Sequence, residues 1–439
     1  MTAANDTSVD VNEKDKEGMT PLHHAVKSGD FKETKVLLEQ GCTINAKSVK
    51  GQTPLHLAAA GGDPAMCSLL IAAGATVDEV DYDNQTPVLL AAMKLHHGVL
   101  EELLKHKADT NISPYWKWTP LHYAAKGGHL EVCELLCNSE VNLTLYDHCK
   151  RTALHLAAEI GQVEICQLLC SYKADMNTCD VSGKTALHLA AERGFMEICQ
   201  NLCSYKADIN ICDVSGKTAL HLAAERGNME ICRHLCSFKA DVNISDVSGK
   251  TALYYAGRRN QLDICHLICK SGIDINKKDD TGRTLLFQFA ENGFTQVCKM
   301  LISAGAVVDH HDKDNYTPLH VAAAAGHLDI CKMLCNIMYV GIRHISKFTP
   351  LHAAAQNGHT EVCRLLCKHM TNVNVINYDG KTPLHLAAQK GHTRVCSVLS
   401  EHMTSIDVQD NNGQTPLELA EKRGHTEVCK LLRNCQTLK

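Results

Sequence analysis

A fifteen-residue word returns along this chain at a fixed interval, and this recurrence limits the fold more than any other feature. The word runs from Asp180 to Gly194 and returns 33 residues later from Asp213 to Gly227, and a degraded copy begins at Asp246. A strict period of this length indicates a stack of similar units, each of which buries its apolar face against its neighbours. A chain of 439 residues can therefore form one continuous array, although a single globular core rarely exceeds about 300 residues.

The threonine of this word marks 13 units, which all start 33 residues apart except for one step of 32. Threonine suits a helix N-cap, and the proline that follows it in many copies suits the first helical position. Eleven units have a glycine nine positions later, which predicts a left-handed residue at the helix end, and Leu95 and Asn260 replace it elsewhere. A second amphipathic stretch, as at residues 163–170, precedes a turn that predicts a short hairpin. The starting threonines are Thr20, Thr53, Thr86, Thr119, Thr152, Thr185, Thr218, Thr251, Thr284, Thr317, Thr349, Thr382 and Thr415.

These units read Thr-Pro-Leu-His, as at residues 53–56, or Thr-Ala-Leu-His, as at residues 152–155, and over residues 8–435 the chain resembles the ankyrin-repeat family. The resemblance implies an all-α repeat solenoid of helix-turn-helix units with projecting β-hairpin loops. We expect an N-terminal segment, residues 1–19, which carries the hairpin of a partial repeat. A solenoid of 13 repeats follows at residues 20–439 and ends in a more polar C-terminal cap.

The charge balance and the cysteine spacing indicate where such a chain works. The 44 basic and 49 acidic side chains form no basic face, so we expect no nucleic-acid binding. No stretch approaches the ~18 uninterrupted apolar residues of a membrane span, and the first residues lack the pattern of a signal peptide. The sequence therefore predicts a monomer that does not insert into membranes and that lies in the reducing cytoplasm, with the nucleus as the alternative.

The cysteines, 23 in all, recur with the repeat, and seven units carry a pair four residues apart on one helix face. A structural zinc site needs four convergent ligands, whereas buried cysteine packs as a small apolar residue. We interpret these pairs as core residues and keep a thiol or metal sensor as the alternative. The pairs are Cys133/Cys137, Cys166/Cys170, Cys199/Cys203, Cys232/Cys236, Cys265/Cys269, Cys331/Cys335 and Cys363/Cys367.

The histidines fall into two recurring sets, and neither stands in a catalytic motif. The set within the word resembles the structural histidine of the family, which hydrogen-bonds across neighbouring repeats, and we interpret the second set, at the start of the second helix, as structural too. The chain has no nucleophile motif, His-Glu-x-x-His zinc motif or phosphate loop, so we predict no catalysis and no cofactor. The first set is His56, His122, His155, His188, His221, His320, His352 and His385, and the second is His129, His327, His359, His392 and His425.

Repeat four departs most from the common word, because its hairpin contains both tryptophans of the chain. The resemblance places partner contacts four, three and one positions before the threonine and seven and eight positions after it. Tyrosine and tryptophan dominate binding hot spots, so we expect a contact site here, with rings that fold back onto the hairpin as the alternative. The predicted contact residues along the chain are Tyr82, Tyr115, Trp116, Trp118, Lys126, Arg193, Arg226, Tyr339 and Phe348.

Two further segments carry open alternatives. The connector at residues 335–348 is one residue short and unusually apolar, which indicates either a hinge or a second contact site. A charged stripe on the first helices is either a solvated face or a surface that steers a charged partner. It consists of Glu159, Glu192, Glu225, Arg193, Arg226, Arg258 and Arg259. The resemblance also suggests hydroxylation of hairpin asparagines, namely Asn177, Asn210, Asn243 and Asn276.

Together these features predict a non-catalytic scaffold or adaptor that binds partner proteins on its hairpins and inner helices. Two alternatives stay open. One is the cytosolic ankyrin arm of a larger membrane channel, and the other is the cysteine-based redox or metal sensor.

Overall fold

The structure of this chain is a computed structural model that describes residues 10–139, 141–337, 347–370 and 372–438. Within these residues it contains 26 helices, and the β pairing found there is one isolated bridge between Ser245 and Thr251. The chain divides into two compact units, Met1–Ala240 and Asp241–Lys439. The predicted all-α repeat solenoid is confirmed, since each repeat contributes two helices that pack on the equivalent helices of the next repeat within each unit.

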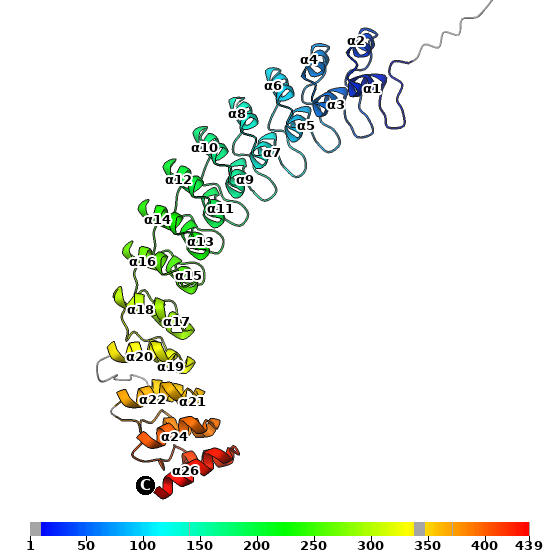
Figure 1. The fold of residues 1–439 in the computed structure, drawn as a ribbon. Coiled ribbons are helices and arrows are strands. Elements are labelled where there is room, and N and C mark those ends of the chain that lie inside the picture. Colours follow the sequence, from blue (N-terminus) through cyan, green and yellow to red (C-terminus); the bar gives the residue numbers. More distant parts are fainter. Residues whose placement is uncertain (1–9, 140, 338–346, 371, 439) are drawn as a thin grey trace, which may run out of the picture. The chain divides into compact units, whose positions relative to one another are not determined.

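In the first unit the odd-numbered helices form one row and the even-numbered helices form a second row behind it (Figure 1). The loops that precede the odd-numbered helices project from the same side of the stack. The bounds are α1 Pro21–Ser28, α2 Phe31–Glu39, α3 Pro54–Gly61, α4 Pro64–Ala72, α5 Pro87–Lys94, α6 His97–Lys105, α7 Pro120–Gly127, α8 Leu130–Asn138, α9 Ala153–Ile160, α10 Val163–Ser171, α11 Ala186–Arg193, α12 Met196–Ser204, α13 Ala219–Arg226 and α14 Met229–Ser237.

The second unit repeats this arrangement of two helical rows. Its bounds are α15 Ala252–Arg258, α16 Leu262–Lys270, α17 Leu285–Asn292, α18 Thr295–Ser303, α19 Pro318–Ala325, α20 Leu328–Ile337, α21 Pro350–Asn357, α22 Thr360–His369, α23 Pro383–Lys390, α24 Thr393–His402, α25 Pro416–Lys422 and α26 Thr426–Leu438.

The repeated word explains where each odd-numbered helix begins and ends. Thr185 is the extended N-cap residue of α11, and Gly194 ends that helix in the left-handed conformation with a φ of 87°. Leu95 and Asn260, which replace this glycine in two repeats, also adopt positive φ values of 64° and 56°. The tight turn between the two helices is therefore kept at both positions, at a cost of roughly 1–2 kcal/mol for a residue such as leucine.

In the repeats that carry it, the histidine of the word links one repeat to the next. In repeat six the backbone N–H of Thr185 donates to His188 Nδ1 at 3.2 Å, and His188 Nε2 lies 3.1 Å from the carbonyl oxygen of Lys217. Because Nδ1 accepts, the proton resides on Nε2, which donates to the next repeat from a neutral ring. Burial lowers the pKa of His188 and so favours this neutral form.

The predicted structural role of these histidines is confirmed wherever their contacts are described. His23, which the sequence analysis did not include, makes the same link to the carbonyl of Gln52 at 3.0 Å. In the second set, His359 reaches back to the carbonyl of Ala324 at 2.9 Å. The further forward links run from His56 to Gln85, His122 to Arg151, His155 to Lys184, His320 to Phe348, His352 to Lys381 and His385 to Gln414.

The loops are tight turns and not the expected β-hairpins, since the described residues hold one isolated bridge and no strand. The aspartate five positions before the threonine explains this difference. Asp180 Oδ1 accepts from the backbone N–H groups of Ser182 and Lys184 at 2.8 and 2.9 Å. A carboxylate thus takes the donors that a strand ladder would use, and neighbouring loops join by single bonds such as Val181 N–H to Cys149 O at 3.0 Å.

Repeats eight and nine lack the histidine link altogether. Tyr254 and Phe287 occupy the histidine position, and the Thr251 hydroxyl oxygen is buried without a hydrogen-bond partner among the described residues. Residues of the loop 245–251 and of the segment 274–288 line a surface cavity of about 490 Å³. The second unit is therefore less tightly linked at this interface than at those where the histidine is present.

Candidate functional site

The loop of repeat four is built differently from the others. Pro114 stands where other repeats have the loop-forming aspartate, so this turn lacks the carboxylate acceptor. It keeps the backbone bond that the other loops also make, with Lys117 N–H donating to the Pro114 carbonyl at 2.8 Å. Lys117 takes a φ of 61° at the position that glycine holds in repeat six. In the described part of the chain, residues 115–117 make no backbone hydrogen bond to a neighbouring loop. This loop is therefore not joined to its neighbours by the backbone bonds that link other loops.

Trp118 lies against the start of α7. Its ring packs edge-to-face on Tyr123 with centroids 5.0 Å apart, and the Lys126 ammonium lies 4.8 Å from the ring centroid. The Trp118 side chain is half-buried in these contacts. The alternative prediction, that the rings fold back onto the hairpin, therefore holds in part for Trp118.

Trp116 and the tyrosines beside it are more open. The Trp116 indole N–H donates to the Tyr123 hydroxyl at 2.9 Å, and 36% of the residue stays exposed. Tyr115 is 82% exposed and Tyr82, at the same position one repeat earlier, is 65% exposed. Tyr123 was missed by the sequence analysis, and its signal is that tyrosine replaces the leucine found at this position in repeats five to seven. We call Tyr82, Tyr115, Trp116, Trp118, Tyr123 and Lys126 the aromatic surface.

Arg193 and Arg226, also predicted as contact residues, belong to a row of intramolecular ion pairs. Arg193 lies 3.1 Å from Glu159 of the preceding repeat, and Arg226 lies 3.1 Å from Glu192. Lys184 pairs with the other oxygen of Glu192 at 2.5 Å. Both arginines remain more than half exposed, but their charges are balanced within the protein, as expected for a solvated face.

The predicted contact residues of the second unit fall on the connector before α21. Tyr339 lies outside the described residues, as do residues 338–346. Phe348 is half-buried, with its ring stacked on His352 at 5.4 Å between centroids and edge-on to Tyr316 at 6.1 Å. The described end of this connector is thus tied into the helical stack by aromatic contacts.

The asparagines considered for hydroxylation join successive loops. Asn177 Oδ1 accepts from Asp208 N–H at 2.9 Å, and Asn243 and Asn276 accept equivalent bonds from the repeats that follow them. Asn210 is half-buried at the same position. Hydroxylation of these four residues stays a prediction.

Most members of the cysteine pairs are buried in the core, whereas Cys236 and Cys269 are partly buried, and all of these cysteines are free thiols. Burial raises the pKa of Cys133 to about 12 and that of Cys137 to about 11. At neutral pH these groups are thiols, which are poor nucleophiles and poor metal ligands. The interpretation of the cysteine pairs as core residues therefore fits better than the sensor alternative.

Among the described residues, one group of three potential metal ligands lies within 4.8 Å, namely Asp147, His148 and Cys149. Asp147 accepts from the backbone N–H groups of Cys149 and Arg151 and pairs with the Arg151 guanidinium at 2.9 Å. Its carboxylate is thus committed to shaping the repeat-five loop. These three adjacent residues also fall short of the four convergent ligands of a structural zinc site.

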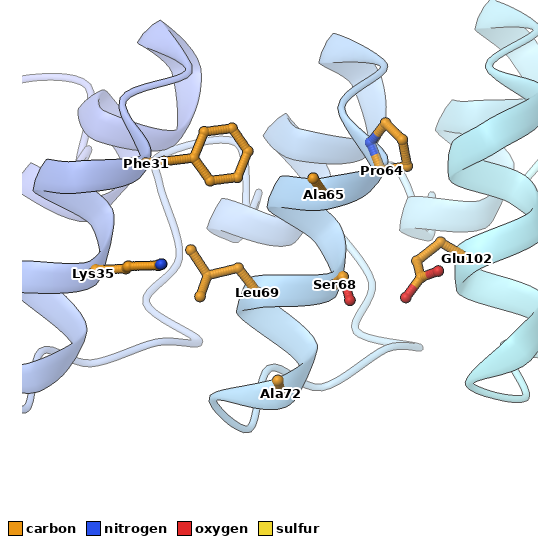
Figure 2. Close-up of a pocket in the computed structure, with 8 residues that line it drawn as sticks. All are labelled: Phe31, Lys35, Pro64, Ala65, Ser68, Leu69, Ala72 and Glu102. Carbon is orange, nitrogen blue, oxygen red and sulfur yellow. The ribbon is translucent and has the colours of Figure 1, made fainter.

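A depression of about 520 Å³ is lined by residues of the even-numbered helices α2, α4 and α6 (Figure 2). Its floor is α4, which has no charged residue, and Lys35 of α2 and Glu102 of α6 lie on either side. This depression was not predicted from the sequence. The signal was the uncharged stretch Pro64–Ala72.

The two helical rows and the row of projecting loops define this protein as a tandem helical-repeat protein. A family model that describes three consecutive ankyrin repeats matches this chain along nearly its whole length, so the chain belongs to the ankyrin-repeat family. The matched ranges are residues 4–81, 55–147, 139–213, 196–279, 275–344, 339–410 and 369–438. Ankyrin repeats are in general modules that bind other proteins. Within the described residues, no helix is long and apolar enough to cross a bilayer.

Solved structures include a similar protein, the ankyrin repeat domain of Bcl-3, described as a unique member of the IkappaB protein family. It is 28% identical to this chain and superimposes with a TM-score of 0.47, covering 49% of this chain and 98% of the Bcl-3 domain. The comparison with curated proteins gives no match.

Proposed function

We propose that this protein is a non-catalytic scaffold or adaptor that binds partner proteins on the face formed by its loops and odd-numbered helices. The observation that carries this proposal is the aromatic surface of repeat four. Tyr115 is 82% exposed and Trp116 is 36% exposed, although a folded chain gains free energy by burying such rings. Rings of this kind, held on a rigid scaffold, bury a large area on binding at little ordering cost.

Several contacts support this reading of the aromatic surface. The Trp116–Tyr123 hydrogen bond and the Trp118–Tyr123 contact hold the two indoles before any partner arrives. The word histidines are neutral hydrogen-bond links, and the buried cysteines are thiols, so neither set supplies a reactive group. The abundance of free thiols favours a reducing location such as the cytoplasm or the nucleus.

The test compares partner capture by the full chain with capture by a Tyr115→Ala/Trp116→Ala variant. We expect the wild type to retain one or more proteins that the variant binds at least tenfold more weakly, the size expected for loss of hot-spot rings. The matched control is Tyr378→Ala, because Tyr378 occupies the same loop position in repeat twelve and is 68% exposed. Equal capture by all three proteins would reject repeat four as the binding site.

A further inference from the structure

Four lysines of repeats three to five, of which Lys126 is part of the aromatic surface, have charges that no described acidic group balances. Lys117 and Lys150 stand at the same loop position of repeats four and five, and Lys94 and Lys126 lie at the ends of α5 and α7. All four are exposed, and within the described part of the chain none of them forms an ion pair. We call these residues the lysine group.

The ion-pair row of repeats five to seven shows why this group is unusual. There, the residue seven positions after the threonine is a glutamate such as Glu159, and the next repeat sends Arg193 to it at 3.1 Å. In repeats two to five the same two positions bring Ala60 of repeat two beside the position of Lys94 in repeat three, and Lys126 of repeat four beside that of Ile160 in repeat five. The repeat geometry that pairs charges in one part of the unit therefore leaves positive charge uncompensated in another.

The two lysine contacts that do form are with aromatic rings. The Lys126 ammonium lies 4.8 Å from the Trp118 ring centroid, and the Lys117 ammonium lies 5.5 Å from that of Tyr146. A ring attracts the cation without cancelling its charge, so both lysines remain available to an anion. Asp83 is an exposed acid close by in the chain, beside Tyr82.

We propose that the aromatic surface and the lysine group together bind an extended acidic peptide segment with one large apolar residue. Each carboxylate would meet a lysine, and the apolar side chain would lie on Tyr115 and Trp116. Neighbouring repeats are roughly 10 Å apart, and a polyproline II segment rises about 3.1 Å per residue and returns a side chain to the same face every third residue. Acidic residues three positions apart in such a segment therefore fit the lysines of successive repeats. This inference rests on the proposed function and specifies the partner's chemistry.

The test uses a synthetic peptide of about 15 residues with a glutamate at every third position and one central phenylalanine. Its binding to the full chain is followed by tryptophan fluorescence, alongside versions with glutamine or lysine in place of glutamate. We expect the glutamate peptide to bind at least about tenfold more tightly than the glutamine peptide and to weaken as salt rises from about 50 to about 300 mM.

The matched variants separate this inference from the proposed function. Lys94→Gln/Lys117→Gln/Lys126→Gln/Lys150→Gln should lose most of the preference for glutamate over glutamine, whereas Lys184→Gln/Lys217→Gln should keep it because those lysines are already paired. Loss of a captured partner in the Tyr115→Ala/Trp116→Ala variant, but not in the lysine variant, would uphold the binding site and overturn the acidic partner. Failure of the glutamate peptide to bind more tightly than the glutamine peptide, or tighter binding of a single-stranded oligonucleotide of equal charge, would also overturn it.

Discussion

Repeats four and six share one backbone plan but present opposite chemistry on it. In repeat six, Asp180 forms the loop, and Lys184 meets Glu192 where that loop touches the helix. In repeat four the equivalent positions hold Pro114, Trp118 and Lys126. An ion pair in one repeat is a cation–π contact in the other.

This difference distinguishes residues that stabilise the stack from residues that are available to bind a partner. In repeat six the polar groups of the loop satisfy one another, so its surface has little left to offer a partner. In repeat four the loop is held by its backbone, which leaves rings and ammonium groups exposed. The core link is the same in both, since His122 and His188 each donate to the next repeat at 3.1 Å.

The largest effect is expected when the residues of repeat four are replaced by those at the equivalent positions of repeat six. Trp118→Lys/Lys126→Glu should restore an ion pair of the Lys184–Glu192 type and leave the thermal unfolding of the protein largely unchanged. Partner affinity should fall by about 3 kcal/mol, or over a hundredfold, because a desolvated aromatic anchor is lost. Calorimetric titration with the captured partner measures this, and an affinity within threefold of wild type would break the comparison.

The shared histidine link predicts equal losses of stability in the two repeats. His122→Ala and His188→Ala should each lower the free energy of unfolding by about 2 kcal/mol, because a buried carbonyl and a buried threonine lose their partner. Chemical denaturation measures both, with the exposed His24→Ala as the control. Losses that differ by more than about 1 kcal/mol would mean that the two repeats also differ in their core.

Acid should weaken both repeats for the same reason. Burial lowers the pKa of His122 and His188 below the ordinary value of 6.5. Below pH 6.5 the unfolded chain therefore takes up protons that the folded chain does not, and the free energy of unfolding falls as pH falls. We expect the denaturation midpoint to fall steadily as the pH is lowered from about 7.5 to about 5.5, because the unfolded histidines take up protons over this range. Unchanged midpoints over this range would contradict the neutral link.

The smallest effect concerns the ion-pair row. Arg226→Ala should change the free energy of unfolding by less than about 0.5 kcal/mol, because its pair with Glu192 is largely solvated. Partner affinity should also stay within about twofold if this face is only a solvated row. A tenfold loss of affinity would instead extend the binding surface from repeat four to repeats six and seven.

Much of the fold could be predicted from the sequence because its determinants are local. Threonine and glycine mark the ends of the first helix, and the strict period places every copy, even where Leu95 stands for glycine. The prediction of β-hairpins was wrong because the sequence identifies Asp180 only as a common turn residue. That its carboxylate accepts two backbone N–H bonds is seen only in the structure.

The candidate site was predicted in part. Trp116 and Trp118 stand out as the two tryptophans of the chain, but their shared contact with Tyr123 depends on ring orientations that the sequence does not specify. The pairing of Arg193 with Glu159 depends on the offset between successive repeats, which is a property of the stack. The sequence shows that Tyr254 replaces the histidine that links neighbouring repeats. It does not show that the Thr251 hydroxyl is thereby buried without a hydrogen-bond partner among the described residues.

The most direct measurement uses the fact that these two tryptophans are the only ones in the chain. Their fluorescence therefore reports on repeat four alone. If repeat four is the binding site, saturating amounts of the captured partner will shift the emission to shorter wavelength and protect it from a soluble quencher. An emission spectrum and quenching that do not change while the partner is bound would contradict the central claim.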